Sequence, residues 1–349
     1  LNIYNIGMSY SDLLDAIKKN QIKVDEKRLK MVYDFAAAAH EGQVRQSGDA
    51  YITHPLAVAK TLASWKQPQP VLEAALLHDV AEDTSHSLAE IASLFGGEIA
   101  FLVDGVTKIG RVKLRGSTDA IFVENLRKMF VAMARDIRVI LIRLADRFHN
   151  MQTLDAVPIS KQRRIAKETI EVYAPLAERL GMGLLKGDLE DLAFPHIYPE
   201  EFHRLNEEVK KHLASAEKVT KSAIAAIKKS LAAKNLKAEV HGRHKRKYSL
   251  YKKLTRPGID GDWNKIHDLV ALRIVTNDKM ECYSVLGLVH DLWQPVPYIG
   301  ISDFIAQPKP NGYQSIHTKV FDHKGNIIEV QIRTRAMHEE AEYGAAAHT

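Results

Sequence analysis

The segment LLHDVAED, residues 76 to 83, places an imidazole and three carboxylates within a few positions of one another. On a helix, His78 and Glu82 share a face because they are four residues apart, and the same spacing relates Asp79 to Asp83. Four such groups amid Leu and Val are costly to bury unless a cation or hydrogen bonds compensate them. A bound metal is the simplest compensation, and mixed imidazole and carboxylate ligands suit Mn²⁺, Fe²⁺ or Zn²⁺. A surface helix with solvated charges is the alternative.

Two other segments supply candidate distal ligands, namely His54 in YITHP and Asp146 in RLADRFHN. From about residue 25 to 192, apolar residues recur at spacings of three and four, so an all-α domain is predicted to carry them. A Pro-containing break at 194–199 and a charged, alanine-rich helical run at 200–234 follow. We therefore place the first domain at residues 1–197 and a partly exposed helical connector at 198–235.

A second set of candidate residues begins with RHKRKYSLYKK, residues 243 to 253, which has six Lys or Arg in eleven positions and two interleaved tyrosines. Such a stretch is typical of a solvated basic face or of a nucleic-acid patch. β-branched runs interrupted by one helical stretch predict an α+β domain over residues 236–349, with a hairpin at HKGN. Asp268 beside one strand and Glu329 in a later strand could together hold Mg²⁺ against nucleotide phosphates.

Composition limits the remaining possibilities. The 349 residues suffice for two domains, each with its own core. Cys282 is the only cysteine, which excludes an intramolecular disulfide and a Cys-rich zinc module. We expect a soluble, cytoplasmic protein without a membrane partner, because no segment resembles a signal peptide or a membrane helix. A net charge of +6 and a pI near 9.1 favour polyanionic partners without choosing between phosphates and nucleic acid.

Several strings in the first domain carry a family resemblance. VRQSGDAYITHP, LLHDVAEDT, LVDGVTK, RLADRFHNMQTL and AKETIEVYAPLAERLG occur in this order. Together they closely resemble the hydrolase domain of the long RelA/SpoT homologues, enzymes that make or destroy the alarmone (p)ppGpp. The likeness runs through most of residues 25–197 and rests on several independent motifs.

This resemblance implies a Mn²⁺-dependent 3′-pyrophosphohydrolase that releases pyrophosphate and GDP or GTP from (p)ppGpp. The metal would polarise the 3′-diphosphate and lower the pKa of bound water. The resemblance assigns the metal to His54, His78, Asp79 and Asp146, the attacking water to Glu82 and Asp83, the guanine nucleotide site to Arg45 and Ser47, and the sugar to Asn150 and Thr153.

The basic stretch, PKPNGYQSIHT, IIEVQIRT and AEYGAAAH resemble the synthetase domain of the same homologues, over roughly residues 236–349. This implies a nucleotidyltransferase-like fold with a mixed sheet, and transfer of pyrophosphate from ATP to the 3′-hydroxyl of GDP or GTP. The implied residues are Asp268 and Glu329 for Mg²⁺, with Glu329 also activating the hydroxyl; Arg243, Lys245, Ser249 and Lys253 for ATP; Tyr313 stacking on guanine; and Lys309, Asn311 and His317 completing the acceptor site.

One departure from the family pattern concerns the synthetase domain. Bifunctional members usually carry Arg-x-Lys-Asp and synthetase-only members Glu-x-Asp-Asp, whereas this chain reads Gly300-Ile301-Ser302-Asp303. A charge-assisted phosphate contact contributes about 1.5 to 3 kcal/mol, so losing two could slow or remove synthesis. A hydrolase whose second domain only binds nucleotide or holds shape is therefore the alternative to a bifunctional enzyme. An RNA-binding module that uses the basic stretch is a remote one.

Two expectations concern regulation. The family continues beyond AEYGAAAH into domains that sense the ribosome and amino acids, so we expect a catalytic fragment that meets the ribosome only through such domains. Simultaneous synthesis and hydrolysis would waste ATP, so we also expect residues 176–234 to couple the two activities antagonistically.

Overall fold

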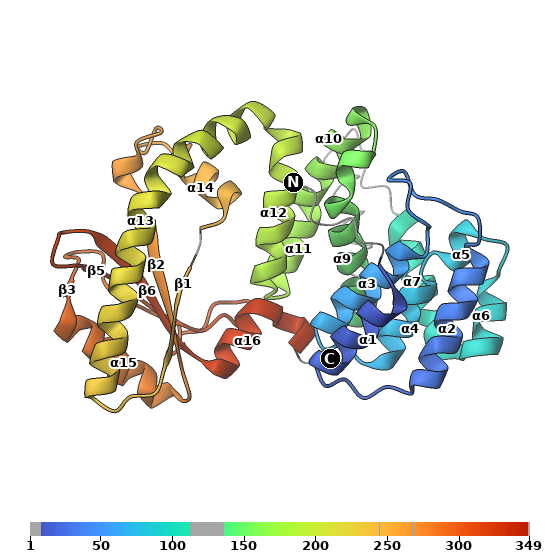
Figure 1. The fold of residues 1–349 in the computed structure, drawn as a ribbon, viewed down its shortest axis with the longest axis horizontal. Coiled ribbons are helices and arrows are strands. Elements are labelled where there is room, and N and C mark those ends of the chain that lie inside the picture. The colour runs from blue at the N-terminus through green and yellow to red at the C-terminus, as the bar shows by residue number, and fades with distance from the viewer. Residues whose placement is uncertain (1–7, 112–135, 244, 267–268, 348–349) are drawn as a thin grey trace. The chain divides into compact units, whose positions relative to one another are not determined.

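The computed structural model describes residues 8–111, 136–243, 245–266 and 269–347 (Figure 1). The chain divides into two compact units, a first unit of residues 1–173 with 346–349 and a second unit of residues 174–345. Among the described residues, no helix is both long and apolar enough to cross a membrane.

The described part of the first unit is helical, as the spacing of apolar residues predicted. Its helices are α1 (Tyr10–Lys19), α2 (Glu26–Ala39), α3 (Thr53–Ser64), α4 (Gln69–Leu77), α5 (Val80–Asp83), α6 (Leu88–Phe95), α7 (Gly97–Arg111), α9 (Ile137–Gln152) and α10 (Ile159–Glu168), with a 3₁₀ turn at Leu154–Ala156 and a π-helical turn at Thr169–Tyr173. Helices α3 and α4 form the centre, because α3 contacts α1, α4 and α9 while α4 also contacts α2 and α7. Every α4 residue from Val71 to Leu77 is buried.

The second unit combines helices with a six-stranded sheet. Its helices are α11 (Ala174–Arg179), α12 (Gly183–Ile197), α13 (Pro199–Ala233), α14 (Lys247–Leu254), α15 (Lys279–Leu292) and α16 (Arg335–Tyr343), and its strands are β1 (Glu239–Gly242), β2 (Val270–Thr276), β3 (Gln294–Pro295), β4 (Ser302–Asp303), β5 (Ile316–Phe321) and β6 (Ile327–Thr334). The strand order is β1-β2-β6-β5-β3, with β4 paired to β5. Only the β2–β6 pair among these is parallel. The predicted mixed sheet is thus confirmed, and the predicted HKGN hairpin joins β5 to β6.

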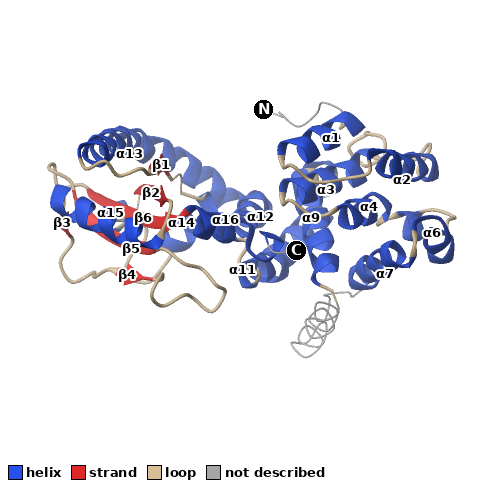
Figure 2. Ribbon diagram, turned by 90° about the horizontal axis from the view of Figure 1, so that it is seen from below, coloured by secondary structure: helices blue, strands red, loops and turns tan. Residues whose placement is uncertain are grey.

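The two faces of this sheet differ in character. Alternate residues such as Leu272, Ile274 and Val330 are buried in an apolar cluster with side chains of α13 and α15. Figure 2 shows these helices, in blue, with the strands in red. The opposite face carries polar side chains, because the β6 residues Glu329, Gln331 and Arg333 alternate with the apolar residues of the strand. This polar face is where the predicted synthetase residues of the strands lie.

Helices α12 and α13 belong to the second unit by their packing. Lys252 on α14 pairs with Glu190 on α12 at 2.8 Å, and the backbone N–H of Tyr248 donates to Asp191 at 2.9 Å. On α13, Ile227 and Leu231 are buried in the apolar cluster of the sheet. The run that we expected to form a partly exposed helical connector is a helix with many exposed residues, and its buried residues pack on this core; the division at residue 173 precedes the boundary that we placed at 197.

Candidate functional site

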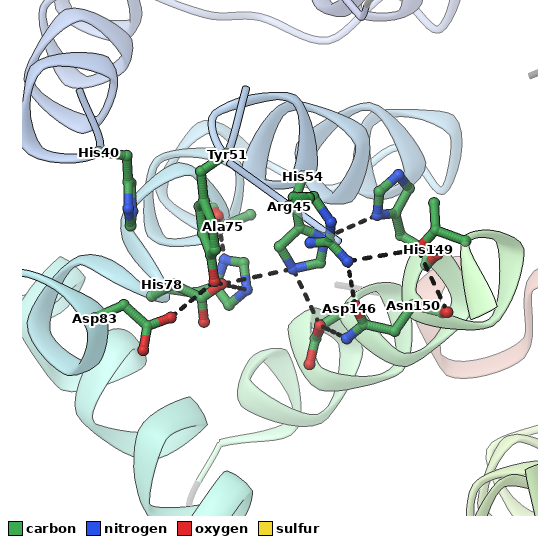
Figure 3. Close-up of polar contacts among 12 residues, drawn as sticks. His40, Arg45, Tyr51, His54, Ala75, His78, Asp83, Asp146, His149 and Asn150 are labelled. Atoms are coloured by element: carbon green, nitrogen blue, oxygen red, sulfur yellow. Dashed lines mark hydrogen bonds and ion pairs between the residues drawn. The ribbon is translucent and has the colours of Figure 1, made fainter. Parts of the chain in front are cut away.

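Three of the predicted metal ligands converge in the first unit (Figure 3). His54 lies in the first turn of α3, His78 follows the last residue of α4, and Asp146 lies on α9. One ligand atom from each of the three lies within 4.8 Å of the others, and all three residues are buried. An imidazole pair and a buried carboxylate that meet in this way suggest a site for a divalent metal.

Asp79, the fourth predicted ligand, borders this group without being a member of it. Its Oδ2 atom lies 3.2 Å from His78 Nε2 and 3.6 Å from His54 Nε2. The Nε2 atom of His78 is buried and makes no hydrogen bond within the described part of the chain. A buried ring nitrogen that makes no hydrogen bond and lies beside two carboxylates is the arrangement that a cation would complete.

The negative charges of the carboxylates at this site are balanced by a protonated histidine and by one arginine. Burial by itself raises the pKa of Asp146, but Arg143 and His54 outweigh it and lower this pKa. Burial by itself lowers the pKa of His78, yet the carboxylates of Asp79 and Asp146 raise it to about 9. Proteins use divalent cations to balance buried carboxylates of this kind, so the residues present fit a metal.

One structural expectation is wrong. We predicted that His78, Asp79, Glu82 and Asp83 lie on a single helix, but α4 ends at Leu77 and α5 begins at Val80. Residues 78–79 form a turn between the two helices, and the backbone of Asp79 (φ −97°, ψ −11°) lies at the margin of the right-handed helical region. The turn leaves His78 buried with His54 and Asp146, whereas Glu82 and Asp83 are exposed.

Tyr51 connects Asp79 with the exposed Asp83, and this role was not predicted from the sequence. Its hydroxyl oxygen lies 2.9 Å from Asp79 Oδ2 and 2.7 Å from Asp83 Oδ2, so its one proton is donated to either carboxylate in turn. The ring stacks on His40 with centroids 4.5 Å apart. Burial and the two carboxylates raise the pKa of Tyr51, so the phenol stays protonated as a donor. No spacing rule relates residue 51 to residues 79 and 83, so the sequence alone gave no signal for this contact.

Asp146 has three neighbours on its own helix, of which the sequence prediction included only Asn150. Arg143 donates to Asp146 Oδ2 at 2.5 Å, and Asn150 donates to Asp146 Oδ1 at 2.5 Å. His149 places its Nδ1 atom 2.8 Å from Nδ1 of His54, and burial with the nearby His54 and Arg45 lowers the pKa of His149 to about 3. Helical spacings of three and four from Asp146 could have identified Arg143 and His149.

The predicted nucleotide residues of this unit lie partly together. Arg45 donates to Asn150 Oδ1 at 2.9 Å and approaches Thr153 Oγ1 at 3.5 Å. Because Asn150 also donates to Asp146, its side chain joins the predicted nucleotide residues to the predicted metal ligands. Ser47 is exposed and donates to Asp49 at 2.8 Å, so its hydroxyl is engaged apart from the contacts that join Arg45, Asn150 and Thr153.

In the second unit, several predicted acceptor residues gather on the polar face of the sheet. The Tyr313 hydroxyl lies 2.8 Å from Nε2 of His317, and Lys309 Nζ lies 5.2 Å from the Tyr313 ring centroid. Burial lowers the pKa of His317 to about 4; the charges of Lys309 and Arg243 act in the same direction and that of Glu329 opposes them. Electrostatic contact thus relates His317 to three other predicted residues, and its imidazole is uncharged at neutral pH.

The remaining predicted residues of this unit are placed less fully. Asn311 donates to the backbone oxygen of Glu178 at 3.1 Å, so its amide is engaged with the last turn of α11. Lys245 precedes α14, on which Ser249 and Lys253 lie four residues apart and so share a face. Asp268 lies outside the described residues.

Other charged residues of the polar face were missed by sequence reasoning. Arg273 and Arg333 contact the same Glu342 carboxylate, at 3.0 and 3.2 Å. Arg333 is almost fully buried, and burial with the charge of Arg273 lowers its pKa to about 10. Both arginines alternate with apolar residues along their strands, and this sequence pattern could have identified them as residues of the polar face.

The departure at residues 300–303 falls next to the predicted acceptor residues. Ser302 in β4 pairs with His317 in β5, and Asp303 pairs with Ile316. Asp303 accepts hydrogen bonds from the Tyr283 hydroxyl and from the backbone of Ile305, both at 2.9 Å. Directly opposite residues of an antiparallel pair have Cβ atoms about 5 Å apart, so the side chain at 302 is a neighbour of His317.

Comparison with known proteins matches both units. The HD domain family matches residues 33–183, and the family described as a region found in RelA / SpoT proteins matches residues 242–349. A GTP pyrophosphokinase from Myxococcus xanthus is 48% identical over 322 residues, which cover 92% of this chain and 42% of that protein. The bifunctional (p)ppGpp synthase/hydrolase SpoT of Escherichia coli strain K12 is 45% identical, covering 92% of this chain and 45% of that protein. The chain thus spans less than half of these relatives.

A solved structure of a metazoan ortholog of SpoT that hydrolyzes ppGpp is 24% identical to the chain. It covers 49% of this chain and 88% of that one, with a TM-score of 0.34.

Proposed function

The chain belongs to the RelA/SpoT homologues, and from this membership we propose that its first unit hydrolyses (p)ppGpp to pyrophosphate and GDP or GTP, while its second unit synthesises (p)ppGpp. Guanine nucleotides are then substrates of both units, and ATP is the pyrophosphate donor. The observation that carries the proposal is the meeting of His54, His78 and Asp146, with Arg45 linked to Asp146 through Asn150.

In the first unit, each named side chain has a part in hydrolysis. Mn²⁺ held by His54, His78, Asp79 and Asp146 would supply a Lewis acid for the 3′-diphosphate and a bound water of lowered pKa. The exposed carboxylates of Glu82 and Asp83 can orient the attacking water and accept its proton. The Tyr51 hydroxyl holds the carboxylates of Asp79 and Asp83 close to one another.

The proposed nucleotide residues are joined to the proposed metal ligands through Asn150. Arg45 supplies a guanidinium that can contact the nucleotide, and its bond to Asn150 fixes its direction. Asn150 accepts from Arg45 with Oδ1 and donates to Asp146 with Nδ2, so one side chain links the two sets of residues. Ser47 and Thr153 complete the proposed site for base and sugar.

In the second unit, we place the reaction on the polar face of the sheet. Mg²⁺ at Asp268 and Glu329 would neutralise the phosphates of ATP. Arg243, Lys245, Ser249 and Lys253 would bind the donor, while Tyr313 stacks on the acceptor guanine beside Lys309, Asn311 and His317. Glu329 can take the proton of the 3′-hydroxyl; at present it accepts a hydrogen bond from Gln331 at 2.9 Å.

Asp79→Ala tests the hydrolase half. The parent chain, loaded with Mn²⁺, should release pyrophosphate from ppGpp, and Asp79→Ala should lose this activity together with bound Mn²⁺. Synthesis from ATP and GDP should be unchanged in the variant and serves as the control for folding of the second unit. A parent that retains its full ppGpp-degrading rate after chelation would contradict the metal-dependent assignment.

A second candidate function is hydrolysis alone, with a second unit that only binds nucleotide. It is favoured by the pairing of Ser302 with His317, which puts the missing basic side chain at the proposed acceptor site. Ser302→Lys restores that charge at an exposed position and should increase ppGpp formation from ATP and GDP by about tenfold, the equivalent of one charge-assisted contact of about 1.5 kcal/mol. No product from either protein would favour the hydrolase-only reading.

A further inference from the structure

The two nitrogens of His54 face different partners. Nε2 points toward the other proposed metal ligands and lies 3.3 Å from Asp146 Oδ1, whereas Nδ1 lies 2.8 Å from Nδ1 of His149 (Figure 3). His54 is only 2% exposed, so bulk water does not compete for either nitrogen. The contact between the two imidazoles is therefore a fixed feature of the site.

Proton counting restricts how this contact can be made. Two ring nitrogens 2.8 Å apart share one proton, and a neutral imidazole carries one proton on one nitrogen. If His149 supplies the proton, the proton of neutral His54 sits on Nε2, and that nitrogen has no lone pair for a metal. If His54 supplies it from Nδ1, Nε2 keeps its lone pair. Only the second arrangement is compatible with a metal ligand at His54.

We propose that His149 is a positioning residue that accepts the Nδ1 proton of His54 and so fixes the tautomer in which Nε2 can bind a divalent cation. The inference rests on the proposed metal-dependent hydrolase function. His149 lies three residues after Asp146 on α9, so one helix supplies both a proposed ligand and the acceptor that orients another. In this arrangement His149 carries its own proton on Nε2.

Two substitutions separate this role from simple packing. His149→Leu removes the acceptor while filling much of the space. His149→Asn keeps an acceptor, because Oδ1 of asparagine is bonded to Cγ as Nδ1 of histidine is. Loss of an outer-shell partner of a metal-binding histidine typically weakens metal affinity by about 10–100-fold, and we expect that loss for His149→Leu and a change of about threefold or less for His149→Asn.

The measurement is a Mn²⁺ titration of the full chain, with free Mn²⁺ followed by electron paramagnetic resonance. Pyrophosphate release from ppGpp and the thermal unfolding of each metal-free variant are recorded alongside. Equal affinity of the parent and His149→Leu would overturn the inference, as would an equal loss in both variants. A parent that binds no Mn²⁺, or that binds it without degrading ppGpp, would instead overturn the proposed function on which the inference rests.

Discussion

Removing the Tyr51 hydroxyl is the sharpest test of how the two halves of the LLHDVAED segment cooperate. Tyr51→Phe keeps the ring and its stacking on His40 but leaves Asp79 and Asp83 without their shared donor. A hydrogen bond to a charged group contributes about 1.5–3 kcal/mol. Asp83 is exposed and the Asp79 side chain is 20% exposed, so water replaces part of the loss and the lower value applies. We expect kcat/KM for ppGpp hydrolysis to fall about tenfold.

The assay is pyrophosphate release under saturating Mn²⁺, with Tyr33→Phe on α2 as the matched control. A double-mutant cycle then identifies the carboxylate through which Tyr51 acts. If it acts through Asp83, Tyr51→Phe adds little to Asp83→Asn. If it acts through Asp79, the loss persists in that background and Mn²⁺ affinity falls as well. Unchanged hydrolysis and unchanged Mn²⁺ binding in Tyr51→Phe would refute the bridging role.

Three further predictions concern folding and metals. Gly344→Ala should lower the melting temperature of the second unit more than Gly325→Ala. Both glycines have positive φ, which costs about 1–2 kcal/mol for alanine, but only at Gly344 would a Cβ collide with backbone, which adds about 1–3 kcal/mol. Equal decreases in melting temperature for the two variants would contradict this prediction. Burial by itself raises the pKa of Asp136, but hydrogen bonds from Arg138 outweigh it and lower this pKa, so the carboxylate stabilises the fold above about pH 4 and this stabilisation is lost as the pH falls through the lowered pKa. The free energy of unfolding of Asp136→Asn should therefore fall less in acid than that of the parent. Parallel plots of unfolding free energy against pH for the two proteins would argue against this. Chelation followed by Mg²⁺ alone should restore synthesis and not hydrolysis, and equal recovery of both would contradict separate metal preferences.

The class of each unit could be predicted from the sequence because it depends on local periodicity. Apolar spacings of three and four gave the helices of the first unit, and β-branched runs gave the strands of the mixed sheet. The boundary at 197 differed from the division at 173 because helical patterns do not reveal which neighbours a helix packs on. Acidic residues of α12 pair with two residues of the basic stretch, Arg246 just before α14 and Lys252 on it.

The limits of sequence reasoning were different at the two sites. In the first unit, α9 alone carries Arg143, Asp146, His149 and Asn150, so helical spacing from one proposed ligand leads to most of its partners. Contacts that cross between segments, such as that of Tyr51 with Asp79, follow no spacing rule.

In the second unit, the proposed site draws on strands and loops whose register is set by pairing across the sheet. The register decides that Ser302 stands opposite His317, and the sequence alone does not contain it. It also gives the departure at 300–303 a physical meaning. Gly300 has φ +73°, where side chains are strained, so this backbone does not simply accept the arginine of the family pattern, whereas position 302 lies in a regular strand. A basic side chain at position 300 would therefore need a different backbone conformation, whereas one at position 302 can be introduced by a single substitution.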